Sequence, residues 1–226
     1  MNQHIDYWLS FYEGRIPTEK VILDFLCKNC SLQTLEESSI PYGQKLNISR
    51  SLLEALLRSP LKALPILLHK AGCIECVSPA NIPQYSNFAS ALIYLPKLLN
   101  DNMESMTNKE VGYALHQDCS NDIAAKKYGE NHAKLAIACG LATATEKEGY
   151  AAVQISLLGS AYCEFDSEDK LNILQRLCYR IPVIQKAVVS GNAIDSIEES
   201  LLLLSESTRK RRRHNVYELL SFALDE

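Results

Sequence analysis

The sequence lacks the features that would identify a membrane, secreted or nucleotide-hydrolysing protein. Its longest apolar stretch, residues 52–68, is too short and too often interrupted to span the roughly 20 residues of a bilayer. The interruptions are Glu54, Arg58, Pro60, Lys62 and Pro65. The first six residues show no basic region followed by an apolar core, so no signal peptide is expected. We therefore expect a cytoplasmic protein that does not enter a membrane.

Glycine is scarce and never clustered. The nine glycines occur singly, and neither GxGxxG nor GxxxxGK[ST] is present. A phosphate-cradling loop is therefore not expected. The acidic stretch at Glu164, Asp166, Glu168 and Asp169 is confined to one loop and helix start, where it suits helix capping better than a nuclease site. The sequence thus predicts a protein that is not an enzyme.

An excess of positive charge is also absent. The 226 residues carry 23 Lys and Arg against 27 Asp and Glu, a net charge of −4, which argues against a wholly basic nucleic-acid coat protein. With 47% hydrophobic residues the chain can bury a core. Its length corresponds to one or two domains of ordinary size.

Helical periodicity dominates, so the sequence predicts a mainly α protein of two domains. Residues 1–104 are expected to form a helical N-terminal domain, whose β-rich piece at 73–77 leaves open a degenerate winged helix. Residues 105–226 are expected to form a winged-helix domain with a C-terminal helical extension. The expected helices are 108–116, 121–139 (with Ser120 as N-cap), 167–181, 194–203 and 208–224, and a hairpin is expected at 141–145 and 150–156.

Three short segments of the second half have motif-like sequences: IACGL at 137–141, ISLLGSA at 155–161 and LSESTRKRR at 204–212. They resemble a winged-helix module often appended to bacterial restriction and phage-defence proteins, with the patterns YLGL, LTxxGxAL and LSxSTxxRRxxTVxxWL. The resemblance covers about residues 108–226. The chain departs from these patterns near Asn131 and His132, where the module has an aromatic pair, and at Tyr217, where it has Trp.

A small, cysteine-containing chain with this module also resembles the accessory subunit of Lamassu/Ddm-type defence complexes. That resemblance implies an anti-phage or anti-plasmid role without catalysis. It also implies partners, an SMC-type ATPase and a nuclease, that supply the chemistry.

The sharpest motif of the first half is a pair of CxxC elements. Four thiolates from two such pairs can hold tetrahedral Zn²⁺. Buried free cysteines are an equally good interpretation of the first pair, which lies in an apolar helical pattern. The expected metal site is structural, and its ligands would be Cys27, Cys30, Cys73 and Cys76.

The first 208 residues carry 18 basic residues against 24 acidic ones, so the basic run at 209–213 is a local reversal of charge. Cations at the start of a helix oppose its dipole, so a function is expected for them. Contact with DNA phosphates is one hypothesis, and ion pairing with Glu198, Glu199 or Glu206 is the alternative. The run consists of Arg209, Lys210, Arg211, Arg212 and Arg213.

The helix predicted at 121–139 would be the recognition helix, with Lys126, Lys127 and Lys134, together with Asn131 and His132, as its donors. Asp122 and Glu130 oppose phosphate binding, so docking on a protein is an equal possibility. The leading hypothesis is a non-enzymatic accessory subunit that contacts the DNA phosphate backbone, its protein partners or both. The alternative is a free-standing winged-helix transcriptional regulator.

Overall fold

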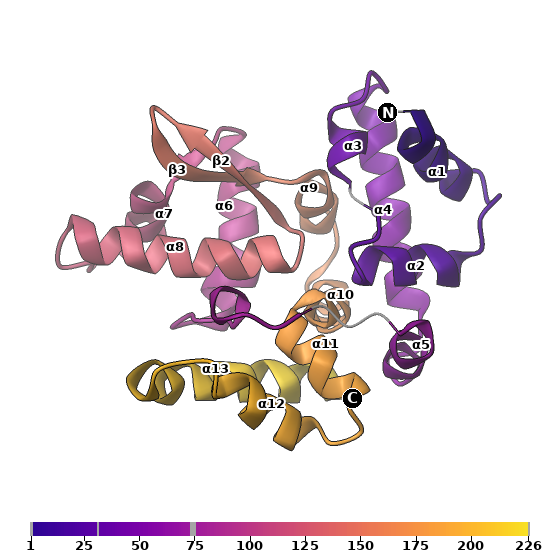
Figure 1. Ribbon diagram of the computed structural model, residues 1–226. Coiled ribbons are helices and arrows are strands. Elements are labelled where there is room, and N and C mark those ends of the chain that lie inside the picture. Colours follow the sequence, from indigo (N-terminus) through magenta and orange to yellow (C-terminus); the bar gives the residue numbers. More distant parts are fainter. Residues whose placement is uncertain (1, 31, 73–75, 226) are drawn as a thin grey trace.

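A computed structural model of the chain describes residues 2–30, 32–72 and 76–225, and these are mainly helical (Figure 1). The prediction of a mainly α protein is therefore confirmed. The N-terminal helices are α1 (Asn2–Tyr12), α2 (Thr18–Leu26), α3 (Gln33–Glu36), α4 (Tyr42–Arg58) and α5 (Ala63–Ala71). Helix α5 ends at Gly72, whose φ of 63° suits a residue without a side chain.

A compact unit of helices and a small sheet follows an irregular segment that contains a 3₁₀ turn, η1 (Pro79–Asn81). The unit consists of a π-helical turn η2 (Ser90–Tyr94), α6 (Leu95–Asn102), β1 (Met106–Thr107), α7 (Asn108–Leu115), α8 (Asp122–Ala138), β2 (Ala142–Lys147) and β3 (Tyr150–Ile155). The strands form an antiparallel sheet in the order β1-β3-β2, in which Val153 lies opposite both Met106 and Ala144. Both predicted helices and the predicted hairpin of this region are present.

Helices α7 and α8 approach each other so closely that their backbones nearly touch. A side chain at Gly129 would place its Cβ 1.9 Å from the carbonyl oxygen of Asn108, and one at Gly112 would lie 1.9 Å from that of Ala125. Glycine is therefore required at both positions. The contact closes a core of its own, formed by Leu95, Leu99, Val111, Ala133, Ala136, Ala142 and Val153.

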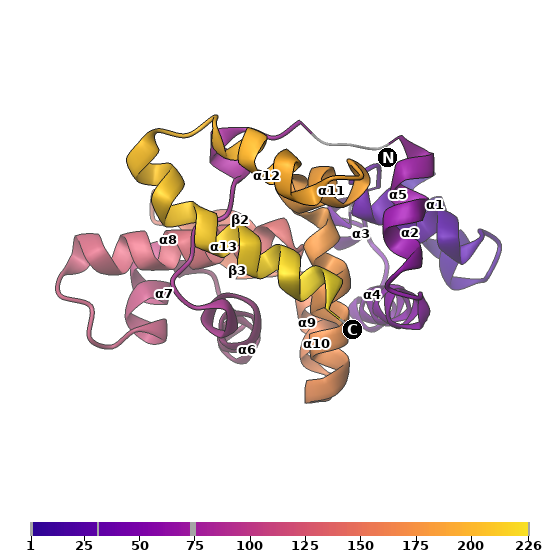
Figure 2. The ribbon, with the colours of Figure 1, turned by 90° about the horizontal axis from the view of Figure 1, so that it is seen from below.

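Five helices complete the chain: α9 (Leu157–Cys163), α10 (Ser167–Leu177), α11 (Pro182–Val189), α12 (Ala193–Leu201) and α13 (Glu206–Leu224), with a 3₁₀ turn η3 (Cys178–Arg180) after α10. Helix α9 packs on α4, and α11 packs on α5 and α12. Figures 1 and 2 show α12 and α13 together on one side of the molecule. The large core joins N-terminal side chains such as Trp8 and Phe25 with C-terminal ones such as Tyr162 and Tyr179.

The structure differs from the sequence-based expectation in several elements. Strand β1 and helix α9 lie where the sequence predicts neither a strand nor a helix. The helix expected at 167–181 ends at Leu177, and the chain starts a separate helix, α11, at Pro182. Proline is well suited to a first helical turn because it needs no amide hydrogen there. In the strand expected at 73–77, Cys76 and Val77 belong to no strand, whereas residues 73–75 lie outside the described part of the chain.

Candidate nucleic-acid interface

Arg212, the fourth residue of the basic run, forms its hydrogen bonds within the protein. It is half-buried, and its Nη1 donates to the carbonyl oxygens of Pro79 at 2.7 Å and Ile82 at 2.8 Å. Its Nε donates to Gln84 Oε1 at 3.3 Å. Burial, followed by the neighbouring Arg211, lowers the pKa of Arg212, although a guanidinium stays charged at neutral pH. Arg212 thus fastens segment 79–84 to α13.

A second set of contacts holds the same segment. Tyr85 donates its hydroxyl to the carbonyl oxygen of Asn215 at 3.0 Å, and Asn215 Nδ2 donates back to the carbonyl oxygen of Tyr85 at 2.8 Å. Phe88 packs edge-on against Phe222 of the same helix, with 4.7 Å between ring centroids. Residues 79–88 are therefore held against α13, and residues 80–84 form a wall beside this helix.

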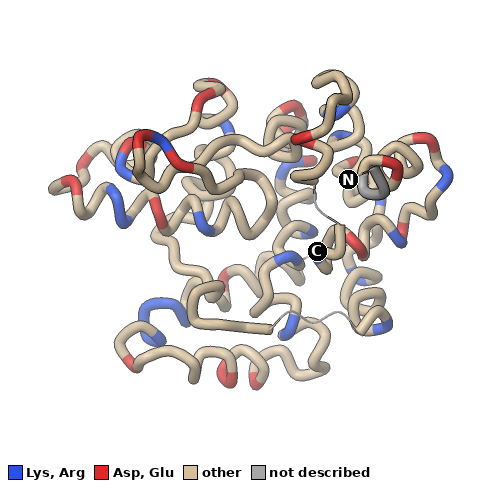
Figure 3. Tube along the Cα trace, turned by 45° about the horizontal axis from the view of Figure 1, so that its top comes forward, with Lys and Arg blue, Asp and Glu red and all other residues tan. Residues whose placement is uncertain are grey.

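The other members of the run point in several directions around α13. Arg213 pairs with Glu198 of α12 at 2.5 Å, and Lys210 pairs with Glu206 one turn earlier at 3.0 Å. These are two of the three carboxylates expected as partners, whereas Glu199 pairs with Lys186. Arg211 Nη2 donates to Thr208 Oγ1 and Arg209 Nη2 to the carbonyl oxygen of Leu204, both at 3.4 Å. The run does not form one flat basic face. Figure 3 shows blue and red residues scattered over the described part of the chain.

Helix α8 begins after Asn121, whose side chain accepts a hydrogen bond from the amide of Ala124 at 2.9 Å. Asn121, and not the expected Ser120, is thus the N-cap. Lys126, Lys127 and Lys134 are exposed and Asn131 is half-buried. His132 is 1% exposed, and its Nδ1 lies 2.7 Å from the carbonyl oxygen of Tyr128, so it belongs to the core and cannot reach a ligand.

Glu130 lies between two of these lysines. Lys134 Nζ is 2.6 Å and Lys127 Nζ 3.1 Å from its carboxylate, and these contacts, that of Lys134 first, lower the pKa of Glu130. Pairs this exposed contribute at most about 1 kcal/mol. Both ammonium groups can therefore turn from Glu130 to an incoming anion at small cost.

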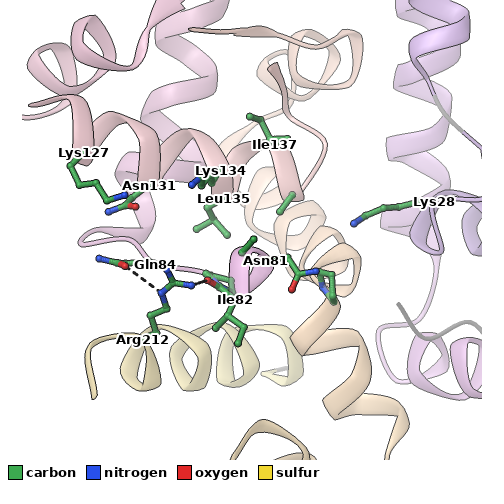
Figure 4. Close-up of a pocket in the computed structure, with 14 residues that line it drawn as sticks. Lys28, Asn81, Ile82, Gln84, Lys127, Asn131, Lys134, Leu135, Ile137 and Arg212 are labelled. Carbon is green, nitrogen blue, oxygen red and sulfur yellow. Dashed lines mark hydrogen bonds between the residues drawn. The ribbon is translucent and has the colours of Figure 1, made fainter. Parts of the chain in front are cut away.

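The two lysines and Arg212 meet at one groove, although they come from distant parts of the sequence. The groove has a volume of about 310 Å³ and lies between α8 and the wall formed by residues 80–84 and α13 (Figure 4). Lys127 and Asn131 extend from α8 toward the hydrogen-bonded side chains of Gln84 and Arg212, and Lys28 points into the groove from the side. The groove is lined by the cations Lys28, Lys127, Lys134 and Arg212, by Asn81, Gln84 and Asn131, and by seven apolar residues. None of its lining residues is Asp or Glu.

The opposite end of α8 has a different electrostatic character. A cavity of about 500 Å³ between the starts of α7 and α8 and the hairpin is lined by three carboxylates, those of Glu110, Asp122 and Glu148, and two lysines, Lys109 and Lys126. Lys109 pairs with Asp122 at 3.2 Å. Lys126 has no hydrogen-bond or ion-pair partner within the described ranges. Lys126 and Lys127 are thus adjacent in sequence but face sites of different charge.

The remaining predicted residues are placed as follows. Cys27 and Cys30 are buried and Cys76 is exposed, whereas Cys73 lies outside the described residues. Over the ranges that the structure describes, no three His, Cys, Asp or Glu side chains are grouped as metal ligands. The four-cysteine zinc site therefore stays a prediction. Of the acidic stretch, Asp166 caps α10 by accepting from the amide of Asp169 at 2.9 Å, as expected.

Three polar groove residues, Lys28, Asn81 and Gln84, were missed by sequence reasoning. Lys28 lies between the cysteines of the first CxxC pair and has a φ of 56°, and Gln84 lies in an irregular segment. None of them has a local sequence signal that indicates a binding site, because the groove exists only where five separate parts of the chain meet.

No helix in ranges 2–30, 32–72 and 76–225 combines the length and apolar character needed to cross a bilayer. No protein-family model, curated protein or solved structure gave a match to this chain.

Proposed function

We propose that this chain is a non-enzymatic DNA-binding subunit that holds the phosphate backbone in the groove between α8 and α13. The observation that supports it is the convergence of Lys28, Lys127, Lys134 and Arg212 on a groove without a lining carboxylate, in a chain of net charge −4. Lysine and arginine side chains are the usual phosphate contacts of DNA-binding proteins. The cations of the groove thus oppose the charge of the chain as a whole.

The fold around the groove supports a winged-helix assignment for residues 95–155. The order α6, β1, α7, α8, β2, β3 gives three helices followed by a hairpin, and β1 completes the sheet along β3. In the order of elements, α8 corresponds to the recognition helix of a winged helix and β2–β3 to the wing. Helix α6 lies before residue 105, so this module starts earlier than the sequence boundary suggested. Helices α9–α13 are its C-terminal extension.

The sequence resemblance supports a wider context for this DNA contact. We propose that the chain acts in the cytoplasm as the accessory subunit of an anti-phage or anti-plasmid defence complex. An SMC-type ATPase and a nuclease would supply the catalysis. Its own part would be to position DNA. A stable complex with such an ATPase when the two are co-expressed supports this context, whereas a symmetric dimer on a palindromic site favours the transcriptional regulator.

The DNA contact is tested with the full chain and a labelled DNA that has a duplex part and a single-stranded tail. We expect log K to fall linearly with log salt, and Lys127→Ala/Lys134→Ala to reduce the slope by about 1.4–1.8, because each phosphate contact contributes about 0.7–0.9. Arg50→Ala/Arg58→Ala, on α4 and away from the groove, is the charge-matched control. Equal loss in both variants, or no binding at low salt, would overturn the proposal.

A further inference from the structure

The groove does not end at Lys28, and its continuation bears on the form of DNA that fits it. A second cavity, of about 290 Å³, shares Lys28 and Ile137 with the first. It runs on between α2–α3 and the start of β2, and its other lining residues include Phe25, Thr143, Ser156 and Arg180. Together the two cavities form a slot that runs from the space between α8 and residues 80–84 to the space between α2–α3 and the start of β2.

One further cation, Arg180, lines this continuation. The Arg180 guanidinium stacks 4.0 Å from the centroid of the Phe25 ring and donates from Nη1 to the carbonyl oxygen of Phe25 at 2.9 Å, so its position is fixed. One carboxylate, Glu36, also lines the continuation, and its Oε1 accepts from the amide of Leu157 at 2.9 Å. Cations thus occur in both halves of the slot, joined by Lys28.

A duplex cannot use this slot. An α-helix with its side chains is about 10–12 Å across and fills a major groove about 12 Å wide. Along Lys127–Ala138, the face of α8 that lines the slot has the 80–84 wall opposite it, and Arg212 and Tyr85 fasten that wall to α13. Helix and wall together are wider than the major groove. The C-terminal two thirds of α8 therefore cannot enter DNA as a recognition helix.

The open start of α8 is a poor alternative for a duplex. Its cavity is lined by three carboxylates, and one of its two lysines is already paired with Asp122. Phosphates are repelled where carboxylates outnumber free cations. The cationic surface of α8 and the surface accessible to a duplex are thus on different sides of the helix.

The interior of the slot suits unpaired bases. Its lining includes the apolar side chains of Leu135 and Ile137 on α8 and of Ile82 on the facing segment. The half-buried amide of Asn131 faces the Gln84–Arg212 pair. An amide side chain can donate to and accept from a base edge, which only an unstacked base exposes in full. Volumes of about 300 Å³ are at the small end of ligand sites, which fits one nucleotide at a time.

We propose that the slot binds an extended single strand of nucleic acid, with phosphates on Lys127, Lys134 and Lys28 and bases against Leu135, Ile137 and Asn131. The inference rests on the proposed DNA-binding function and specifies the form of the substrate. Single-stranded tails, bubbles and ends are the places where DNA offers such a strand.

The test compares labelled dT12 with a blunt 20-bp duplex, using the full chain and three variants that remove only charge. We expect dT12 to bind at least about tenfold tighter than the duplex at low salt. Lys28→Gln and Lys127→Gln should each lower the salt slope for dT12 by about 0.7, and Lys126→Gln, one residue away on the other side of α8, should leave it unchanged. A parallel arm with rU12 shows which sugar the slot accepts.

The outcomes separate the inference from the function on which it rests. If the duplex binds as tightly as dT12 and Lys127→Gln weakens both, the single-strand inference is overturned and the DNA-binding function stands. If Lys126→Gln weakens dT12 as much as Lys127→Gln does, binding lies outside the slot and the inference is also overturned. If neither probe binds, both proposals fall.

Discussion

Replacing Gly129 by alanine tests the closest contact in the fold. The new Cβ would lie 1.9 Å from the carbonyl oxygen of Asn108, whereas an ordinary contact is at least 3.4 Å, so α7 and α8 must separate by roughly 1.5 Å. The obstacle is backbone on both helices, so no side-chain rotation relieves it. Because Val111 on α7 and Ala133 on α8 belong to the same small core, that separation also opens the core between them.

Overpacking of this kind costs about 1–3 kcal/mol and sometimes more, and a backbone contact places Gly129→Ala at the upper end. In a chain of this length, a loss of about 3 kcal/mol lowers Tm by roughly 6–12 °C. The matched control is Gly43→Ala in α4, where a Cβ meets nothing within 4 Å. Alanine there should stabilise by about 0.4–1 kcal/mol, because it restricts the unfolded chain.

The assay is urea unfolding followed by circular dichroism, with Gly129→Ala, Gly43→Ala and Gly112→Ala/Gly129→Ala beside the wild type. The double variant should lose less than the sum of its single changes, because the first substitution already separates the helices that the second would press apart. Gly129→Ala with a stability equal to that of Gly43→Ala would refute the close approach of α7 and α8.

Three further predictions follow from the site and the cysteines. Glu130→Gln should raise DNA affinity by about threefold to tenfold, since it frees Lys127 and Lys134 from a competing carboxylate; weaker binding in a fluorescence-anisotropy titration would contradict this. Burial, and then Asp24, raises the pKa of the Cys30 thiol to about 12. The raised pKa stabilises the fold below the unfolded thiol's pKa, near 9, and this stability is lost as the pH rises from there through 12. Between pH 9 and 10, wild-type stability in urea should therefore fall by about 1 kcal/mol more than that of Cys30→Ala, and parallel curves would contradict this. If the two CxxC pairs hold zinc, metal analysis of protein purified without chelator should give one equivalent per chain, lost in Cys73→Ser, and a metal-free protein would rule out the site.

Helices α7 and α8 and the β2–β3 hairpin could be predicted because their signals are local. Asn121 can cap a helix, Gly140 has the φ of 83° that ends it, and the two strands alternate around a Gly149 turn. Helix α11 was missed because its apolar pattern follows that of α10 almost without a break. Pro182 is compatible both with the end of one helix and with the first turn of the next. Local signals cannot distinguish these two roles of proline, since both depend on what the chain packs against.

The groove could not be predicted, because nothing in the sequence places residue 28 beside residue 137 or residue 84 beside residue 212. The basic run illustrates the same limit. Helical geometry predicts that Arg209, Arg212 and Arg213 share the apolar side of α13. Arg209 and Arg212 are half-buried as predicted, but Arg213 is exposed, as are Lys210 and Arg211. Helical geometry does not reveal that Arg212 donates to carbonyl oxygens about 130 residues earlier in the chain. The sequence alone therefore cannot distinguish a phosphate contact of Arg212 from a structural one.

The density of charge along the sequence therefore differs from its density in space. A cation 4 Å from a phosphate interacts with it by about 4 kcal/mol at an effective dielectric constant of 20, whereas salt screens an exposed charge beyond about 8–10 Å. Only cations that converge on one place add up in this way. Lys28, Lys127 and Lys134 are spread over more than 100 residues but line one groove, whereas four of the five cations at 209–213 point elsewhere. Arg212 is the exception, and it contributes twice, once as charge and once as the clamp that holds the wall facing α8. The main contribution of the run to the groove is therefore structural. The hydrogen bonds of Arg212 hold the wall that faces Lys127 and Lys134 across the groove.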